Sequence, residues 1–209
     1  MEGHASFEQC DTEGGGESPP GRGGNVFNGD TGFILFEGGV TMQETYLTDE
    51  EGNSGAGIYN LGKIDFKGDS KFQELVAEPG EASGGAIFNA EGAEIRFKRG
   101  ARATFIDCHA ERGGAVFNDG FIRFSGPCLF TECSNSAIYN FGETKVSDGS
   151  IFWHNTDDWD GGGAITNRLG GTLDLGDDLI FELNAANNEE LGCDDIYYEG
   201  DDEDFSCGP

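Results

Sequence analysis

Short runs in which apolar and polar residues alternate follow one another along the whole chain, separated by glycine, asparagine and acidic residues. Two such runs are Glu94-Ile95-Arg96-Phe97 and Phe121-Ile122-Arg123-Phe124. Alternation with a period of two is typical of half-buried β-strands, and no stretch keeps the 3.6-residue apolar period of a helix. The pattern therefore predicts an all-β chain built of many short strands.

The runs belong to an internal repeat with three segments in each unit. The first segment starts at a glycine and reads aliphatic, usually aromatic, asparagine, and its copies end at Asn28, Asn60, Asn89, Asn118, Asn140 and Asn167. A second alternating run follows each copy, and a third has Phe, two residues, and then Cys or Asn. The unit recurs every 22 to 32 residues. Units of this length with three strands each are typical coils of a parallel β-helix.

We therefore predict a single-stranded parallel β-helix of about six to seven coils over residues 1–198, with three short strands per coil. The first coil is incomplete, because Phe7 and Cys10 form a third segment with no first or second segment before it, and 11–23 is predicted to be a loop. The acidic residues 199–209 are predicted to form a C-terminal tail or cap. The open first coil leads us to expect either a longer protein or a cap formed by the first residues.

Paired tetrapeptides give the chain a resemblance to a known family. The GGAI motif is matched by Gly84-Gly85-Ala86-Ile87, Gly113-Gly114-Ala115-Val116 and Gly162-Gly163-Ala164-Ile165. The FxxN motif is matched by Phe152-Trp153-His154-Asn155 and Phe181-Glu182-Leu183-Asn184, while Cys108 and Cys133 replace its asparagine. From about Phe7 to Tyr198 the chain resembles the polymorphic outer-membrane protein repeats of chlamydiae. The resemblance implies a right-handed β-helix of the pectin lyase-like type, extracellular display and adhesion.

Side chains alternate between the two faces of a β-strand, so the asparagines and the aromatic residues lie on opposite faces of the first strand. Its aliphatic position is Val or Ile in every copy and should point inward, together with the asparagine two residues later. Equivalent residues stack about 4.8 Å apart, so we expect a structural asparagine ladder at Asn28, Asn60, Asn89, Asn118, Asn140 and Asn167. The same parity turns an aromatic ladder outward at Phe27, Tyr59, Phe88, Phe117, Tyr139 and Tyr197. This ladder would either stack sugar rings or stack on itself for stability.

The second strand carries a basic ladder on its outward side, formed by Arg96, Arg123 and Lys145. Like charges on neighbouring strands repel, so we expect acidic partners such as Glu94 and Glu143. The ladder would dock an acidic glycan or a partner protein. The alternative is that its charge only keeps sheets from associating.

The third strand presents apolar residues outward in the last coils. They are Leu129, Ile151, Trp153 and Ile180. Because a contiguous apolar surface of this kind marks an interaction site, we expect the C-terminal tail or a partner to cover it.

The cysteines allow two disulfides. Cys108 and Cys133 fill the same slot in consecutive coils, so their spacing suits either a disulfide or two buried thiols. Cys193 and Cys207 flank an acidic segment and would staple a C-terminal cap. No cysteine–histidine cluster has zinc spacing, and we expect no cofactor beyond weak, diffuse Ca²⁺ binding by the acidic loops.

Composition and charge narrow the classes of function. The 209 residues include 36 glycines, 40 acidic residues and only 12 basic residues, for a formal net charge of −28. Such a charge repels nucleic acid and anionic membrane surfaces. No apolar run is long enough for a membrane span, and the first residues lack the features of a secretory signal.

We expect a non-enzymatic surface or extracellular module that serves adhesion, glycan binding or structural support, with glycans or a surface protein as partners. The alternative is a carbohydrate-active enzyme, a polysaccharide lyase or hydrolase, or a fragment of one. Asp157 and Asp177 resemble the first carboxylates of polygalacturonase-type hydrolases. They follow different segments of the repeat and should lie at different corners of the coil, so we assign no catalytic residue.

Overall fold

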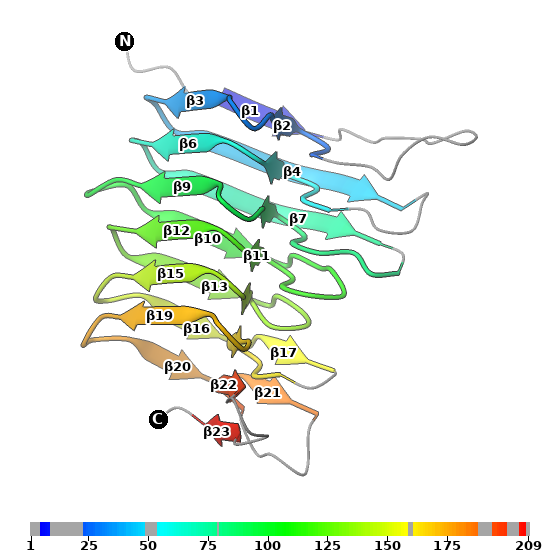
Figure 1. Ribbon diagram of the computed structural model, residues 1–209, viewed down its shortest axis with the longest axis vertical. Helices are drawn as coiled ribbons and strands as arrows, with labels where there is room; N and C mark the ends of the chain where they lie inside the picture. The colour runs from blue at the N-terminus through cyan, green and yellow to red at the C-terminus, as the bar shows by residue number, and fades with distance from the viewer. Residues whose placement is uncertain are drawn as a thin grey trace.

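A computed structural model of the chain describes residues 5–8, 23–48, 54–78, 80–158, 161–187, 194–199 and 205–207, without the side chains of 8 and 205–207. Residues 11–22 of the predicted loop and most of the predicted tail lie outside this set. The described residues form strands and turns and contain no helix. The strands stack into a parallel β-helix (Figure 1). The predicted all-β fold with three strands per coil is confirmed.

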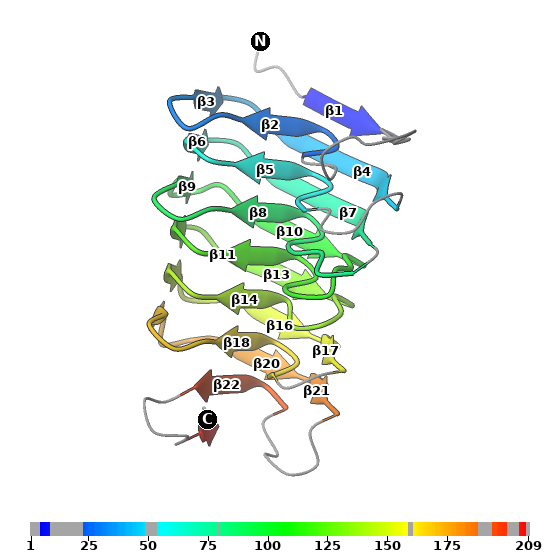
Figure 2. The same ribbon diagram turned by 45° about the vertical axis from the view of Figure 1, so that its right-hand side comes forward.

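Three sheets run along the axis of the β-helix, and each coil contributes one strand to each sheet (Figures 1 and 2). Sheet 1 consists of β2 (Val26–Asn28), β5 (Ile58–Asn60), β8 (Ile87–Asn89), β11 (Val116–Asn118), β14 (Ile138–Asn140), β18 (Ile165–Asn167), β22 (Ile196–Glu199) and β23 (Phe205–Cys207). Sheet 2 consists of β3 (Phe33–Phe36), β6 (Lys63–Phe66), β9 (Glu94–Phe97), β12 (Phe121–Phe124), β15 (Glu143–Val146) and β19 (Thr172–Leu175). Sheet 3 consists of β1 (Ala5–Glu8), β4 (Val40–Leu47), β7 (Ser70–Ala77), β10 (Ala103–Ile106), β13 (Cys128–Thr131), β16 (Ile151–Trp153) and β20 (Ile180–Glu182). A further two-stranded sheet pairs β17 (Thr156–Asp157) with β21 (Ala185–Ala186).

Each coil repeats the register of the coil before it. In sheet 1, Val116 is paired with Ile87 and with Ile138, and all three fill the same position of the repeat. Residues that are equivalent in the repeat are therefore direct neighbours on adjacent parallel strands. Among the described strands, the pairing changes only at the C-terminal end, where β23 runs antiparallel to β22.

The stack makes about five turns, which is fewer than the six to seven coils predicted. Six strands of sheet 1 each contribute one asparagine, and five hydrogen-bonded steps connect these residues, from Asn28 to Asn167. Within the described residues, the two ends add strands that do not complete a further turn. These are β1, which pairs with β4, at one end, and β22 and β23, of which β22 pairs with β18, at the other. A count of repeat copies therefore overestimates the number of complete turns.

The two glycines of the GGA motif meet two separate steric demands. The first lies in the left-handed region, with φ of 65° at Gly84 and 63° at Gly113, where a side chain would be strained. The second has no room for a side chain, because a Cβ on Gly114 would lie 2.1 Å from the Ser134 carbonyl oxygen of the next coil. The motif is thus a requirement of the turn that enters sheet 1, where successive coils approach closely.

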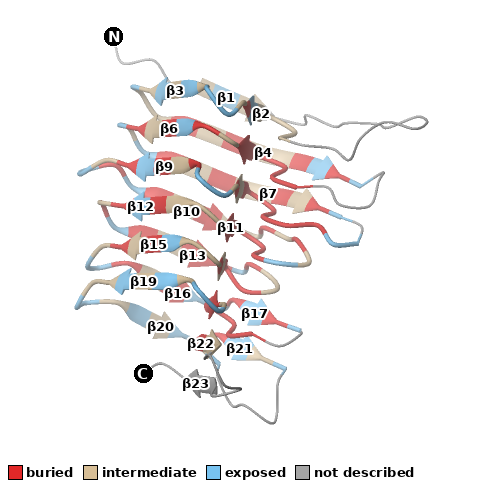
Figure 3. Cartoon of the chain, in the orientation of Figure 1, coloured by how far each residue is buried: buried red, intermediate tan, exposed pale blue. Residues whose placement is uncertain are grey.

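The core is a narrow column filled one coil at a time. Figure 3 shows buried and exposed residues alternating along the strands. Phenylalanine rings stack along the axis, with centroids 4.5 Å apart for Phe66 and Phe97 in sheet 2 and 4.6 Å apart for Phe105 and Phe130 in sheet 3. The two stacks meet edge to face. This packing accounts for much of the unusual phenylalanine content and fixes which side chains face solvent.

Candidate functional site

The basic ladder lies on the outer face of sheet 2. Arg96, Arg123 and Lys145 are cross-strand neighbours on β9, β12 and β15. Asp65 extends the column on one side and Asp174 on the other. The residues that flank the three cations along each strand are buried or partly buried. The strand alternation therefore fixes the three cations outward.

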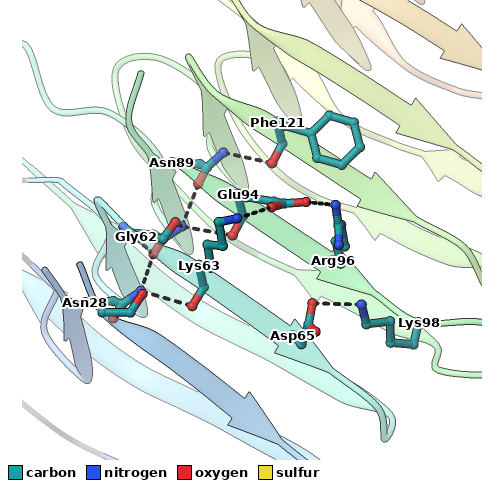
Figure 4. A network of polar contacts seen from close by, with 11 residues as sticks. Asn28, Gly62, Lys63, Asp65, Asn89, Glu94, Arg96, Lys98 and Phe121 are labelled. Carbon is teal, nitrogen blue, oxygen red and sulfur yellow. Dashed lines mark hydrogen bonds and ion pairs between the residues drawn. The ribbon is translucent and has the colours of Figure 1, made fainter. Parts of the chain in front are cut away.

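Carboxylates hold the cations at the N-terminal end of this face. Glu94 bridges two of them, contacting Arg96 and lying 3.4 Å from the Lys63 ammonium (Figure 4). The Asp65 carboxylate pairs with the Lys98 ammonium, with 2.9 Å between Oδ1 and Nζ. These pairs are exposed and contribute little stability, but they neutralise the charges that they join.

Lys145 is held by two carboxylates at the other end of the ladder. Its ammonium lies 3.0 Å from Glu143 and 3.1 Å from Asp174. Hydrogen bonds to Glu143 and then to Asp174 raise the pKa of Lys145 above its ordinary value. The side chain therefore remains a cation at neutral pH.

Two arginines of the same face have no ion-pair partner among the described residues. They are Arg123, at the centre of the ladder, and Arg99, in the turn after β9. Both are exposed, and both line a cavity of about 600 Å³. An unpaired guanidinium offers five N–H donors in a planar fork, which matches a carboxylate or sulfate group.

The cavity spans four successive coils and mixes donors with acceptors. Its polar lining is formed by Arg99, Arg123, Ser125, Lys145, Ser147, Asp148 and Asp174. The Ser147 hydroxyl is buried and has no hydrogen-bond partner among the described residues. We call this cavity the basic groove. Its guanidinium groups suit an anion, while its hydroxyl and carboxylate groups suit the hydroxyl groups of the same ligand.

The aromatic ladder faces away from the core, but most of its rings are covered. Consecutive rings stack from Phe27 to Tyr139, with centroids 4.6 to 5.9 Å apart. Phe27 at the N-terminal end is 54% exposed, whereas Tyr59 and Phe117 are 8% and 9% exposed. Phe88 and Tyr139 are half-buried, and Tyr197 beyond the gap at Thr166 is buried. The geometry therefore matches the alternative in which the rings stack on one another for stability.

The asparagine ladder is internal and fully hydrogen-bonded from coil to coil. Each side-chain amide donates to the side-chain oxygen of the next asparagine, over distances of 2.7 to 2.9 Å. The same amides also donate to backbone carbonyls, such as Asn89 to Phe121 at 3.2 Å (Figure 4). No ladder side chain is open to a ligand, since all six are buried.

The cysteines that the structure describes are free and buried. Cys108 and Cys133 are thiols, which is the second of the two alternatives for this pair, and Cys128 is a thiol as well. The side chains of Cys193 and Cys207, the other predicted pair, lie outside the described residues. Burial, together with the neighbouring Cys133 thiol, raises the pKa of Cys108 well above its ordinary value.

The two carboxylates that resemble hydrolase motifs lie apart. Asp157 is buried on β17 and accepts a hydrogen bond from Ser136 at 2.7 Å. Asp177 lies in the turn between β19 and β20, where its backbone N–H donates to Asp148. They occupy different corners of the coil, as their positions in the repeat predict, and do not form a catalytic pair.

One hydrogen-bonded chain was missed by the sequence reasoning. His109 lies between Ser134, 2.8 Å from its Nδ1, and Asp107, 2.7 Å from its Nε2. The repeat contains a signal for this contact, because His109 and Ser134 fill the same slot in consecutive coils. Hydrogen bonding among Asp107, His109 and Ser134 suits activation of the serine hydroxyl. Neither Ser134 nor His109 lines the basic groove, however. The sequence pattern gave no signal for Ser147, which lies in a turn.

The part of the chain that the structure describes holds no helix with the length and apolarity needed to cross a membrane. Within those same residues, no three His, Cys, Asp or Glu side chains gather into a group that could hold a metal ion.

Comparison with known proteins adds no identification. No family model, no curated protein and no solved structure matches the chain. The geometry of the basic groove is therefore the basis for assigning a function to the chain.

Proposed function

We propose that the chain is a non-enzymatic binding module whose basic groove holds an acidic glycan. One observation carries the proposal. Arg123 stands at the centre of the ladder with no carboxylate partner among the described residues, in the same groove as the equally unpartnered Arg99. A strongly acidic protein that leaves these two cations open has a surface suited to an anionic ligand.

The carboxylates of the groove favour a glycan over a simple anion. Asp148 and Asp174 line the groove beside the arginines, and their oxygens accept hydrogen bonds. An acidic sugar brings a carboxylate or sulfate group for the arginines and hydroxyl groups for these acceptors. The groove crosses four coils, or roughly 14 Å at about 4.8 Å per step, so it suits a short stretch of a longer chain.

The charge state of Lys145 supports binding rather than catalysis. A lyase base must lose its proton near the working pH, which requires a pKa that is lowered toward that pH. The pKa of Lys145 is raised by hydrogen bonds to Glu143 and Asp174. This lysine is therefore a poor proton acceptor, and its charge is balanced by the two carboxylates.

The setting that we propose for this module is the cell surface or the extracellular space. The GGAI and FxxN motifs, which resemble the polymorphic outer-membrane protein repeats, support this setting together with an adhesive role. A surface protein that carries acidic glycans fits the same groove.

Substitution of Arg123 tests the proposal. We expect Arg123→Ala to weaken binding of an acidic oligosaccharide by about 10- to 100-fold, the usual worth of a hydrogen bond to a charged group. The affinity of Arg123→Lys should fall between those of the unmodified protein and Arg123→Ala, because lysine keeps the positive charge but lacks the planar set of N–H donors of the guanidinium. The measurement is isothermal titration with a uronic-acid oligosaccharide and its neutral counterpart.

Arg112→Ala is the matched control, since Arg112 is exposed and lies outside the lining of the groove. Its affinity should equal that of the unmodified protein. Equal affinity of Arg123→Ala and Arg112→Ala would overturn the proposal, and so would equal binding of acidic and neutral oligosaccharides.

A carbohydrate-active enzyme is the second candidate. The observation in its favour is that Asp148 and Asp174 share one groove with arginine and lysine side chains. Release of new chain ends from a polyuronate, lost in Asp174→Asn, would support this candidate over the binding module.

A further inference from the structure

The outer face of sheet 3 changes from polar to apolar along the axis. Its first outward column consists of Thr41, Lys71, Thr104, Leu129, Ile151 and Ile180. Its second outward column consists of Gln43, Gln73, Ile106, Thr131, Trp153 and Glu182. Five large apolar side chains are contiguous in the last four coils, and we call them the apolar face: Ile106, Leu129, Ile151, Trp153 and Ile180.

The apolar face is open to solvent. Trp153 is 39% exposed and Ile180 is 48% exposed, while the other three residues are half-buried. The described part of the C-terminal tail lies elsewhere, because β23 pairs with β22 in sheet 1. Contiguous exposed apolar surface on a sheet marks an interface, so a partner is needed to cover it.

We propose that a second copy of this chain covers the apolar face. The two copies are related by a two-fold axis that lies between the two sheets and runs parallel to β13, so that the two β-helices are antiparallel. Equal spacing of the parallel strands then sets β10 against the partner's β16, and β7 against the partner's β20. Leu129 meets the partner's Leu129, and Ile106 meets the partner's Trp153. Sheets pack face to face in this way at about 10 Å.

Charge at the two ends of the face selects this arrangement. Lys71 lies on β7 and Glu182 lies on β20, and neither has an ion-pair partner among the described residues. The antiparallel arrangement brings each Lys71 beside the partner's Glu182, so the two-fold axis forms the pair twice. The methylene stem of Lys71 then covers the partner's Ile180.

The dimer is weak and sensitive to salt. The five strands involved give a face of roughly 25 by 13 Å on each copy, or about 650 Å² in total, which is smaller than the standard specific interface and makes the association weak. A net charge of −28 on each copy opposes association. Salt screens this long-range repulsion, while burial of the apolar face persists, so the dimer is expected to tighten as salt is added.

Sedimentation equilibrium over a series of protein and salt concentrations tests the dimer. The unmodified protein is expected to form a concentration-dependent dimer, and Ile151→Lys is expected to weaken it at least tenfold. Phe33→Lys is the control, because Phe33 is 61% exposed on β3 of sheet 2, away from the face, and its dimer should be unchanged. Trp153→Ser gives a second disruption of the face, and circular dichroism verifies that each variant is folded.

Charge exchange tests the arrangement of the two copies. Lys71→Glu and Glu182→Lys should each weaken the dimer several-fold, and the double variant should restore it. A protein that stays monomeric at every concentration would contradict the proposal. A dimer that survives both Ile151→Lys and Trp153→Ser, or a double variant no tighter than either single one, would overturn it as well.

Discussion

A single buried thiol shows how burial sets chemistry at the scale of the residue. Cys128 on β13 is 3% exposed, and its sulfur lies 3.2 Å from the Ser150 hydroxyl. Burial raises the pKa of Cys128 to about 12, and the hydrogen bond between the thiol and Ser150 only partly offsets this effect. The thiol is therefore neutral and unreactive in the folded protein at any physiological pH.

The raised pKa of Cys128 makes stability depend on pH. An unfolded cysteine ionises near pH ~8.5, whereas the folded one stays protonated to about 12. The contribution is fully present below ~8.5 and is lost as pH rises, because only the unfolded chain releases the proton. We expect the free energy of unfolding to fall by up to about 1.4 kcal/mol per pH unit for this thiol.

Urea unfolding between pH 8 and 11 (about the range in which the two states differ) gives the measurement. Cys128→Ala removes this one titration and keeps every other group, so its stability should fall less steeply with pH. Identical pH dependence in the two proteins would show that the thiol is not held neutral by burial.

At the scale of the element, the asparagine ladder joins sheet 1 to the turn that follows it. Asn118 donates to Asn140 at 2.9 Å and accepts from Asn89 at 2.7 Å. It also bonds the carbonyl of Glu143 in the next coil at 3.2 Å. Each amide thus satisfies polar groups of its neighbours, and loss of one leaves groups unpaired in two other coils.

We expect Asn118→Ala to destabilise the protein by about 2 to 4 kcal/mol, because it leaves unpaired polar groups and a cavity in the core. Asn187→Ala is the control, since Asn187 is exposed and its side chain bonds only Asp158 among the described residues. Its cost should stay within about 1 kcal/mol. Chemical denaturation measures both, and equal costs would contradict a structural role for the ladder.

The repeat makes the pairing of strands predictable from the sequence alone. Residues equivalent in the sequence, such as Arg96 and Arg123, become neighbours in space because each coil adds one strand to each sheet. The outward direction of Tyr59 followed from the same period, but its burial did not. Burial depends on neighbouring rings and turns, whose lengths vary from coil to coil.

The candidate site was only half predictable for the same reason. The ladder of Arg96, Arg123 and Lys145 is periodic and follows from the strands. Ion pairing of these cations depends on the position of each carboxylate, which the repeat does not specify. Arg99 and Ser147 also line the groove, but they lie in turns that do not follow the repeat. The contact of His109 with Ser134 had a signal in the repeat, namely a shared slot in consecutive coils.

At the scale of the whole molecule, charge and apolar surface are unevenly distributed. Acidic residues give the chain a net charge of −28, yet sheet 2 keeps two arginines without carboxylate partners among the described residues. Sheet 3 ends in the uncharged apolar face on another side of the same β-helix. The rigid stack separates a groove for an anionic ligand from a face for a second copy.

The most direct measurement asks whether the basic groove binds an acidic oligosaccharide without cleaving it. The protein is incubated with a uronic-acid oligosaccharide, and mass spectrometry measures both the retained complex and the length of the recovered sugar. We expect a complex that salt weakens, with the sugar recovered intact. Shortened or unsaturated products without a stable complex would contradict this expectation.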